Sequence, residues 1–270
     1  MFIRQNKYDT GSYSEVDVIP LPDEVKRGSP GRNRRKREYL TRPEQQVLND
    51  RNSFRWMRLC MQGNFVKGDY YFTLTYQEGE IPPPEKVDEA KKDLTNFLRK
   101  CRDRYKKLQK ELKYIWVMEY QLDDEEKYLE RVHFHVVMNA GISRDDLDEC
   151  WSRGGGKNRK ALGYVTTKKI LPSSDTGLEA LAGYFAKGHR WKKGKKLWNC
   201  SRNLDRPYKT KNDYKFTRKQ LEKMATSNDL GAEILAKKYP GYHIASIVFK
   251  ENQFKGWHMY LKMWKKEDGG

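Results

Sequence analysis

Two histidines stand one residue apart in the stretch RVHFHVVMN, where His133 and His135 interrupt an apolar run. Such a run predicts a β-strand, on which alternate side chains share a face. Phe134 and its apolar neighbours then point toward a core, and both imidazoles point to the other side. Imidazole is a frequent metal ligand, so the spacing indicates a metal site in a cleft or on an open sheet face.

A third ligand is expected from the preceding strand, which is predicted over KYIWVMEYQL. The segment DDEEKYLE that follows has the composition of an acidic turn, so the two strands are expected to form a hairpin. Across this hairpin Glu119 can lie beside His133. Two imidazoles and a carboxylate suit a divalent cation, Mg²⁺ or Mn²⁺ with Zn²⁺ as an alternative, and leave positions open for a substrate. Gln121 shares the face of Glu119 and remains an alternative third ligand.

A tyrosine in DTGLEALAGYFAKG has the position of a nucleophile. At about 100° per residue, this predicted helix carries one apolar stripe. The stripe consists of Leu178, Leu181, Ala182 and Phe185. Tyr184 lies outside the stripe and shares a helix face with Lys187. A phenol can attack covalently, and an ammonium nearby favours the phenolate and neutralises a phosphate. The alternative is an ordinary border tyrosine with a solvated lysine, because the chain has 17 tyrosines.

The elements that must position these residues alternate along the middle of the chain. Strands are predicted over DYYFTLTYQ, KYIWVMEYQL, RVHFHVVMNA and GYVTTKKI, and helices over PEKVDEAKKDLTNFLRKCRDRYKKLQKEL, SRDDLDECWSRG and DTGLEALAGYFAKG. This order predicts an α+β fold in which helices pack mainly on one face of an antiparallel central sheet. The plan is the split β-α-β arrangement of ferredoxin-like and RRM-like domains.

Four segments are expected along the chain: a basic flexible arm over residues 1–43, a helix over 44–66, the α+β core over 67–190, and a basic extension over 191–270 packed on the core. The arm, densest in RGSPGRNRRKREYLTRP, can lie along phosphates, or it is an ordinary disordered tail. In the extension, KTKNDYKFTRKQLEKM is expected to hold DNA, and GYHIASIVFK with GWHMYLKMWKK predicts a strand pair.

Charge and composition indicate the class of partner. Lysine and arginine number 55 against 37 acidic residues, a net charge of +18, which favours a polyanion, most often nucleic acid. The four cysteines form no C-x-x-C pair, which argues against a thiolate zinc site and fits free thiols in a reducing cytoplasm. No apolar run approaches the ~20 residues of a membrane span, and the first residues lack the apolar core of a signal peptide. A cytoplasmic protein is therefore expected.

Taken together, these residues resemble the HUH endonuclease superfamily, named for two histidines that flank a hydrophobic residue. Within it they are most similar to the single-tyrosine initiators of rolling-circle replication in phages and plasmids. YYFTLTYQ resembles the first motif of that family, VHFHVVMN the second, metal-binding motif, and YFAK the third, a Y-x-x-K helix. The resemblance covers roughly residues 68–190, and the three motifs occur in the family's order.

The resemblance implies a role for each matching residue. His133, His135 and Glu119 would bind the metal, Tyr184 would be the nucleophile, and Lys187 would assist it. Gly188 stands where a second tyrosine would be, so the two-tyrosine mechanism is not implied.

The implied activity is metal-dependent, site-specific nicking and joining of single-stranded DNA through a 5′-phosphotyrosine, which starts rolling-circle replication. Single-stranded DNA or an origin hairpin would be the substrate, with host helicase and polymerase as partners. Two alternatives remain: a transposase or mobilisation nickase with the same chemistry, and a non-catalytic protein that binds single-stranded nucleic acid on its sheet. Formation of a covalent DNA adduct separates an enzyme from the last of these.

Overall fold

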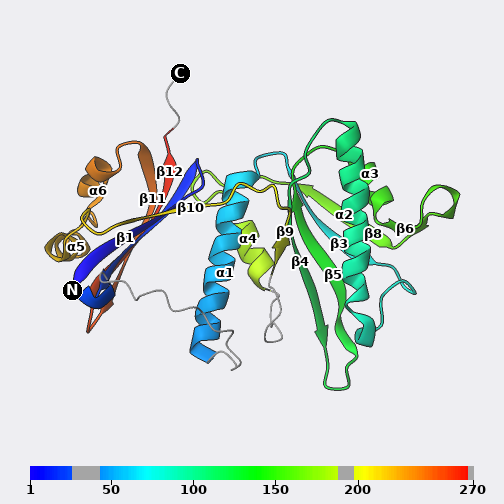
Figure 1. Ribbon diagram of the computed structural model, residues 1–270, viewed down its shortest axis with the longest axis horizontal. Helices are drawn as coiled ribbons and strands as arrows, with labels where there is room; N and C mark the ends of the chain where they lie inside the picture. Colours follow the sequence, from blue (N-terminus) through cyan, green and yellow to red (C-terminus); the bar gives the residue numbers. More distant parts are fainter. Residues whose placement is uncertain (26–42, 188–197, 267–270) are drawn as a thin grey trace. The chain divides into compact units, whose positions relative to one another are not determined.

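The computed structural model describes residues 1–25, 43–187 and 198–266. The chain divides into two compact units, one formed by Met1–Asn49 with Asp205–Gly270 and the other by Asp50–Leu204. The elements of each unit are labelled in Figure 1. Both units contain an antiparallel sheet with packed helices, so the predicted α+β class is confirmed.

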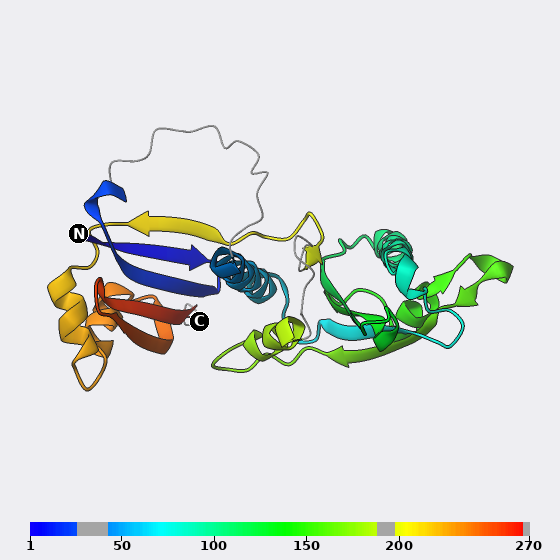
Figure 2. The same cartoon turned by 90° about the horizontal axis from the view of Figure 1, so that it is seen from below.

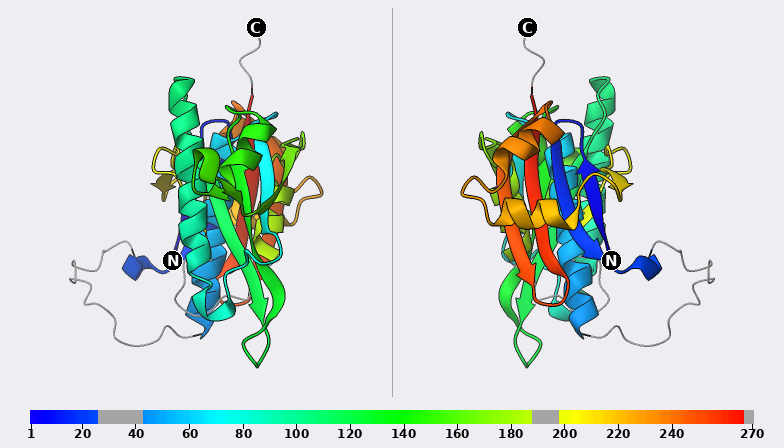
Figure 3. Two further views of the ribbon diagram at one scale, coloured as in Figure 1. Left: turned by 90° about the vertical axis from the view of Figure 1, so that its right-hand side faces the viewer. Right: turned by 90° about the vertical axis from the view of Figure 1, so that its left-hand side faces the viewer.

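The first unit is a five-stranded sheet with the strand order β10-β1-β2-β12-β11. Its strands are β1 (Phe2–Asp9), β2 (Tyr13–Leu21), β10 (Tyr208–Asn212), β11 (Tyr242–Asn252) and β12 (Gly256–Lys265). Its helices are α5 (Arg218–Ala225) and α6 (Ala232–Lys238). Figure 2 shows β10, β1, β2 and β12 side by side, and the right-hand view of Figure 3 shows α5 and α6 across one face of the sheet.

Apolar alternation explains why this sheet forms. Val16 and Val18 of β2, together with Met259 and Leu261 of β12, are fully or almost fully buried in one cluster with residues of α5 and α6. The strand pair predicted for the C-terminal segment is confirmed, because β11 and β12 pair antiparallel from Tyr242 to Lys265.

The flexible arm expected over residues 1–43 is wrong for residues 2–21, which form β1 and β2 inside this sheet. The prediction failed because the nearby basic, Pro-rich and Gly-rich run dominated the composition of the whole segment. The alternation in YSEVDVIPL was the signal that it obscured. The densest basic part falls in residues 26–42, outside the described residues. The segment expected to pack on the core as an extension instead contributes β10, β11, β12, α5 and α6 to the first unit.

The second unit holds the predicted core and is built on a five-stranded sheet of order β8-β3-β5-β4-β9. Its strands are β3 (Tyr70–Tyr76), β4 (Tyr114–Leu122), β5 (Tyr128–Met138), β8 (Gly163–Lys169) and β9 (Asn199–Cys200), with a separate small hairpin of β6 (Ser152–Arg153) and β7 (Lys160–Ala161). Its helices are α2 (Glu89–Lys107), α3 (Arg144–Cys150) and α4 (Glu179–Lys187). The helix α1 (Pro43–Asn64) was predicted over residues 44–66.

Helices cover both faces of this sheet. On one face α2 and α3 pack over the strands, with Phe97, Phe72, Phe134 and Trp151 at the centre of the core. On the opposite face α4 and the second half of α1 pack over Ile115, Val117 and Val137. Figure 1 shows α2 and α4 on opposite sides of β4 and β5. The second layer was not expected, and it decides how deeply the metal-site residues are buried.

Candidate metal and nucleophile site

The predicted hairpin brings the carboxylate beside the histidines. In the antiparallel pair β4–β5, Glu119 lies directly opposite His133. One carboxylate oxygen, Glu119 Oε2, is 3.0 Å from His135 Nε2 and 3.3 Å from His133 Nε2. Ligand atoms around an ion with bonds of about 2 Å lie roughly 3 Å apart, so the donor set fits one divalent cation. Glu119, His133 and His135 are also the group of side chains whose potential ligand atoms all lie within 4.8 Å of one another.

The other nitrogen of each imidazole is held by the sheet. His133 Nδ1 lies 2.9 Å from the carbonyl oxygen of Arg131, and His135 Nδ1 lies 3.0 Å from Thr73 Oγ1. A carbonyl can only accept, so His133 carries its proton on Nδ1 when neutral and leaves the lone pair of Nε2 for a metal. Such outer contacts orient metal-binding histidines and set their tautomer.

The charges of the cluster favour ionised ligands. The hydrogen bonds from His133 and then His135 hold the pKa of Glu119 well below its usual range, although burial opposes this. Burial lowers the pKa of His133, but the hydrogen bonds to Glu119 and to the carbonyl of Arg131 outweigh it, so this pKa is raised. In the absence of a cation, the carboxylate is therefore negative and attracts positive charge to the imidazoles.

Gln121, the alternative third ligand, takes a different position. The pairing of β4 with β5 is irregular after Glu119, and Gln121 pairs with Glu130 rather than with a histidine. Its side chain is exposed. The register therefore favours Glu119 as the third member of the cluster.

The histidine face is more enclosed than expected. His135 is only 3 % exposed, because the rings of Tyr184 and Phe185 lie against it at centroid distances of 5.0 and 5.8 Å. His133 is half-buried. The site thus lies where the cover of α4 ends on the sheet, with His135 beneath the helix and His133 toward its edge.

The helix α4 orients Tyr184 as predicted. The apolar stripe faces the sheet, with Phe185 fully buried and Leu178 and Ala182 almost so, whereas Tyr184 is 49 % exposed. Its phenol is thus both accessible and adjacent to the metal-site cluster. Lys187 is the last residue of α4, and its side chain lies outside the described part of the structure.

Tyr71 of β3 completes the site and was not singled out from the sequence. Its ring contacts that of Tyr184 edge-on at a centroid distance of 5.9 Å and lies 6.2 Å from the ring of His135. Burial and a hydrogen bond to Tyr184 raise the pKa of the Tyr71 phenol, so it stays protonated at neutral pH. Strand alternation contained the signal, because Tyr71, Thr73 and Thr75 share the face of β3 on which Thr73 lies opposite His135.

Comparison with known families agrees with this region of the chain. Residues 69–189 match the family of replication-associated proteins named for ORF2. The matched segment contains Tyr71, Glu119, both histidines and Tyr184, and it supports a role in the initiation of DNA replication. No curated protein matches the chain significantly. No solved structure matches it significantly either. Within the described ranges, none of the helices is both long and apolar enough to cross a membrane.

Proposed function

We propose that this protein is a metal-dependent nickase that cuts and rejoins single-stranded DNA at a specific site and so starts rolling-circle replication. The observation that supports this most directly is the position of Tyr184, whose ring lies 5.0 Å from that of His135 beside three converging metal ligands. The match to replication-associated proteins favours replication over transposition or mobilisation as the biological use.

Glu119, His133 and His135 would hold a divalent cation, Mg²⁺ or Mn²⁺, which polarises the scissile phosphate when bound. The phenol oxygen of Tyr184 attacks the phosphorus in line, and the bond from phosphorus to the 3′ oxygen breaks. A 5′-phosphotyrosine forms, and the proton lost by the phenol is balanced by the proton that the 3′ oxygen gains. The free 3′-OH primes a host polymerase. Rejoining is the reverse reaction and needs no nucleotide, because the phosphotyrosine conserves the energy of the phosphodiester.

Two further side chains are given supporting roles. Tyr71 hydrogen-bonds the attacking phenol and holds it in position. Lys187 is proposed to stabilise negative charge on the phosphate, as the Y-x-x-K resemblance implies. Replacing Lys187 with alanine is expected to leave slow activity, since it removes charge assistance and not the attacking atom.

The decisive experiment is a crosslinking assay with labelled single-stranded oligonucleotides drawn from the region around the protein's own gene. Wild-type protein with Mn²⁺ or Mg²⁺ should give a covalent adduct that survives a denaturing gel, and a chelator should abolish it. Tyr184→Phe should bind DNA and metal normally but form no adduct, because it lacks the attacking oxygen. Tyr164→Phe is the matched control, since it removes the same hydroxyl from a tyrosine of the same unit that is 68 % exposed.

Three results would contradict the proposal in different ways. An adduct formed at the normal rate by Tyr184→Phe would assign another nucleophile. Cleavage by the wild type without any adduct would indicate hydrolysis. Binding without cleavage or adduct on any tested oligonucleotide would favour a non-catalytic single-strand binding protein.

A further inference from the structure

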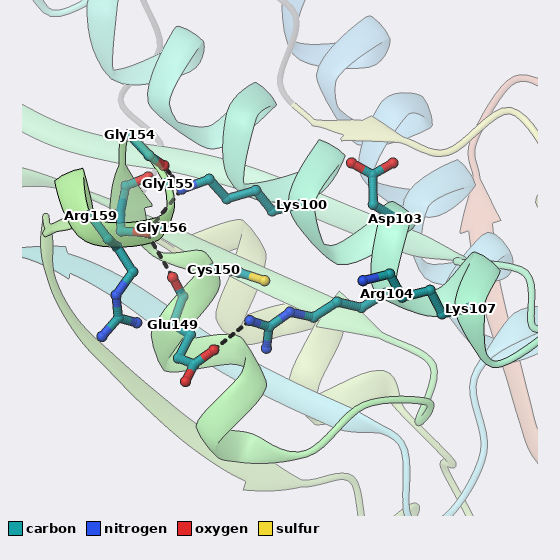
Figure 4. A pocket seen from close by; sticks show the side chains of 11 residues that line it. Lys100, Asp103, Arg104, Lys107, Glu149, Cys150, Gly154, Gly155, Gly156 and Arg159 are labelled. Atoms are coloured by element: carbon teal, nitrogen blue, oxygen red, sulfur yellow. Dashed lines mark hydrogen bonds and ion pairs between the residues drawn. The ribbon is translucent and has the colours of Figure 1, made fainter.

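A basic pocket lies on the second unit, on the side of the sheet covered by α2 and α3. Its volume is about 530 Å³, and Figure 4 shows its lining residues. The lining includes four basic residues, Lys100, Arg104, Lys107 and Arg159, against two acidic ones, Asp103 and Glu149. The metal-site residues point from the opposite face of the sheet, so this pocket is a separate site.

Both carboxylates of the pocket already have cationic partners. Glu149 pairs with Arg104 at 2.5 Å, and Arg104 also contacts Asp146. Asp103 pairs with Arg99, which lies outside the pocket, at 3.6 Å. Lys107 and Arg159 are exposed and have no ion pair among the residues that the structure describes. The pocket therefore presents positive charge that no carboxylate of the described chain balances.

Lys100 adds a cation that is fixed in place. Its ammonium donates hydrogen bonds to the carbonyl oxygens of Ser152 and Gly154, at 2.7 and 2.8 Å, and to the Ser152 hydroxyl at 2.9 Å. These acceptors are neutral, so they hold the ammonium without cancelling its charge. Burial lowers the pKa of Lys100, and the positive charges of Arg99, Arg159 and Arg104 lower it further. A bound anion would relieve this repulsion.

The glycine run at the pocket wall leaves backbone uncovered. Gly154 and Gly156 have positive φ angles of 65° and 55°, so glycine is required there by the backbone. Gly155 has an extended backbone with φ of −162°, and a Cβ atom at this position would meet no atom within 4 Å. Neither conformation nor packing demands glycine at position 155. A bare backbone here fits the close approach of a ligand.

We propose that this pocket binds a phosphate group of single-stranded DNA, held by Lys107, Arg159 and Arg104. Guanidinium groups match the geometry of phosphate oxygens, and a lysine adds a point charge. The proposal rests on the proposed function only in taking DNA as the source of the phosphate. The pocket is a second DNA contact, away from the cleavage site, that positions the strand without reading its sequence.

The test compares two double variants of the full chain. Lys107→Ala with Arg159→Ala removes both unpaired charges of the pocket. Lys106→Ala with Lys157→Ala is the matched control, because these exposed neighbours carry the same charge and do not line the pocket. Affinity for a labelled oligo(dT) is measured at several salt concentrations in the presence of a chelator. Without metal the strand is bound but not cut, so failure of the nickase proposal would not affect this result.

The pocket variant should bind oligo(dT) roughly tenfold more weakly at low salt, as expected when a charge-assisted hydrogen bond to a phosphate is removed. The slope of log affinity against log salt should become shallower by about 0.7 for each phosphate that the variant no longer neutralises. The control should change both quantities much less. Equal weakening in the two double variants would overturn the proposal, since the effect would then be one of general charge.

A variant with the opposite sign strengthens the test. Glu149→Gln frees Arg104 from a competing carboxylate and should tighten oligo(dT) binding several-fold. Asp148→Asn is its control, since it removes one negative charge from the same helix at an exposed position outside the pocket. Equal tightening by the two substitutions would count against the pocket as the binding site.

Inorganic phosphate distinguishes the two sources of the ligand. If oligo(dT) binding is the same in the pocket variant and the control, but phosphate raises the melting temperature of the wild type and not of the pocket variant, the site takes a free phosphate. If neither ligand distinguishes the pocket variant from its control, no phosphate site exists here and the proposal fails.

Discussion

Tyr71 is the residue whose role only its neighbours reveal. It lies on β3 beside Tyr184, and burial together with the hydrogen bond to Tyr184 keeps its phenol protonated by raising its pKa. A protonated phenol of this kind is a poor nucleophile but a good hydrogen-bond partner. Its expected contribution is to hold the Tyr184 oxygen in the attacking position.

Replacing Tyr71 with phenylalanine should therefore slow adduct formation by roughly tenfold, the value of one hydrogen bond of about 1 kcal/mol or slightly more. The adduct should still form, and metal affinity should be unchanged. Single-turnover crosslinking at saturating DNA measures this rate. Complete loss of the adduct would instead make Tyr71 a participant in the chemistry, and an unchanged rate would remove it from the site.

The identity of the third ligand is tested by a pair of neutral substitutions. Glu119→Gln keeps the shape of the side chain but removes its charge, and it should abolish measurable binding of Mn²⁺ because a carboxylate is the anionic ligand of the set. Gln121→Ala should leave binding within about twofold, since Gln121 is exposed and pairs with Glu130. Titration calorimetry with Mn²⁺ measures both. The reverse pattern would make Gln121 the ligand.

At the scale of elements, β3 supports the metal site from beneath. The antiparallel register of β3 and β5 sets Thr73 opposite His135, and the hydroxyl lies 3.0 Å from Nδ1. Such contacts to metal-binding histidines contribute about 10- to 100-fold to metal affinity. Thr73→Val keeps the shape and the strand propensity of the side chain, so it should weaken Mn²⁺ binding by that factor at unchanged fold stability. Thr73→Ser should restore most of the affinity, and failure of this rescue would mean that the methyl group, not the hydroxyl, supports the site.

Strand β1 of the first unit carries an ion pair that gives this sheet a pH dependence. Lys7 Nζ lies 2.6 Å from Asp9 Oδ2 and 2.6 Å from the hydroxyl of Tyr242 on β11. Burial opposes ionisation of both partners, but their hydrogen bonds outweigh it. The pKa of Asp9 is lowered from its ordinary 3.8 and that of Lys7 is raised from its ordinary 10.5.

The signs of the two shifts define a window of stability. A lowered carboxylate pKa stabilises the fold above the unfolded value and is lost as pH falls, whereas a raised lysine pKa stabilises it below the unfolded value and is lost as pH rises. The pair thus contributes fully between roughly pH 4 and pH 10. Lys7→Met should lower the unfolding free energy near pH 7 by about 0.5–1 kcal/mol, and this difference should shrink below about pH 3. Lys219→Met, at an exposed position of α5, is the control, and a pH-independent difference would contradict the assignment.

At the scale of the whole molecule, the two ends of the chain build one unit. Strands from residues 2–21 pair with strands from residues 208–265, and β2 lies in the middle of the sheet, between β1 and β12. Deleting residues 1–21 should therefore expose the apolar residues of β12 and abolish the unfolding transition of the first unit. Circular dichroism and calorimetry of the shortened chain measure this loss. Persistence of a full two-unit transition would show that β1 and β2 are dispensable.

The charge of residues 26–42 is best tested without removing those strands. Glutamine at every basic position of this segment should weaken binding to all oligonucleotides alike and flatten its salt dependence, because phosphate contacts are independent of sequence. A change in the site that is cut, at unchanged affinity, would make the segment a reader of sequence instead.

The sequence by itself determined the local features of the site. The period of two around His133 and His135 placed both imidazoles on one face, and the hairpin with its acidic turn placed Glu119 opposite His133. The apolar stripe of α4 likewise determined that Phe185 is buried and Tyr184 exposed. These features follow from backbone periodicity over a few residues, which any segment carries in its own pattern.

Only the tertiary structure decided what lies between distant segments. Strand pairing across the chain put Thr73 under His135 and Tyr71 beside Tyr184, and it set the Gln121 side chain away from the histidines. The same long-range pairing turned an expected basic arm into two inner strands of a separate sheet. Periodicity states which face a side chain occupies, but the partner that covers this face is chosen by packing energy over the whole chain, and composition contains no information about that choice.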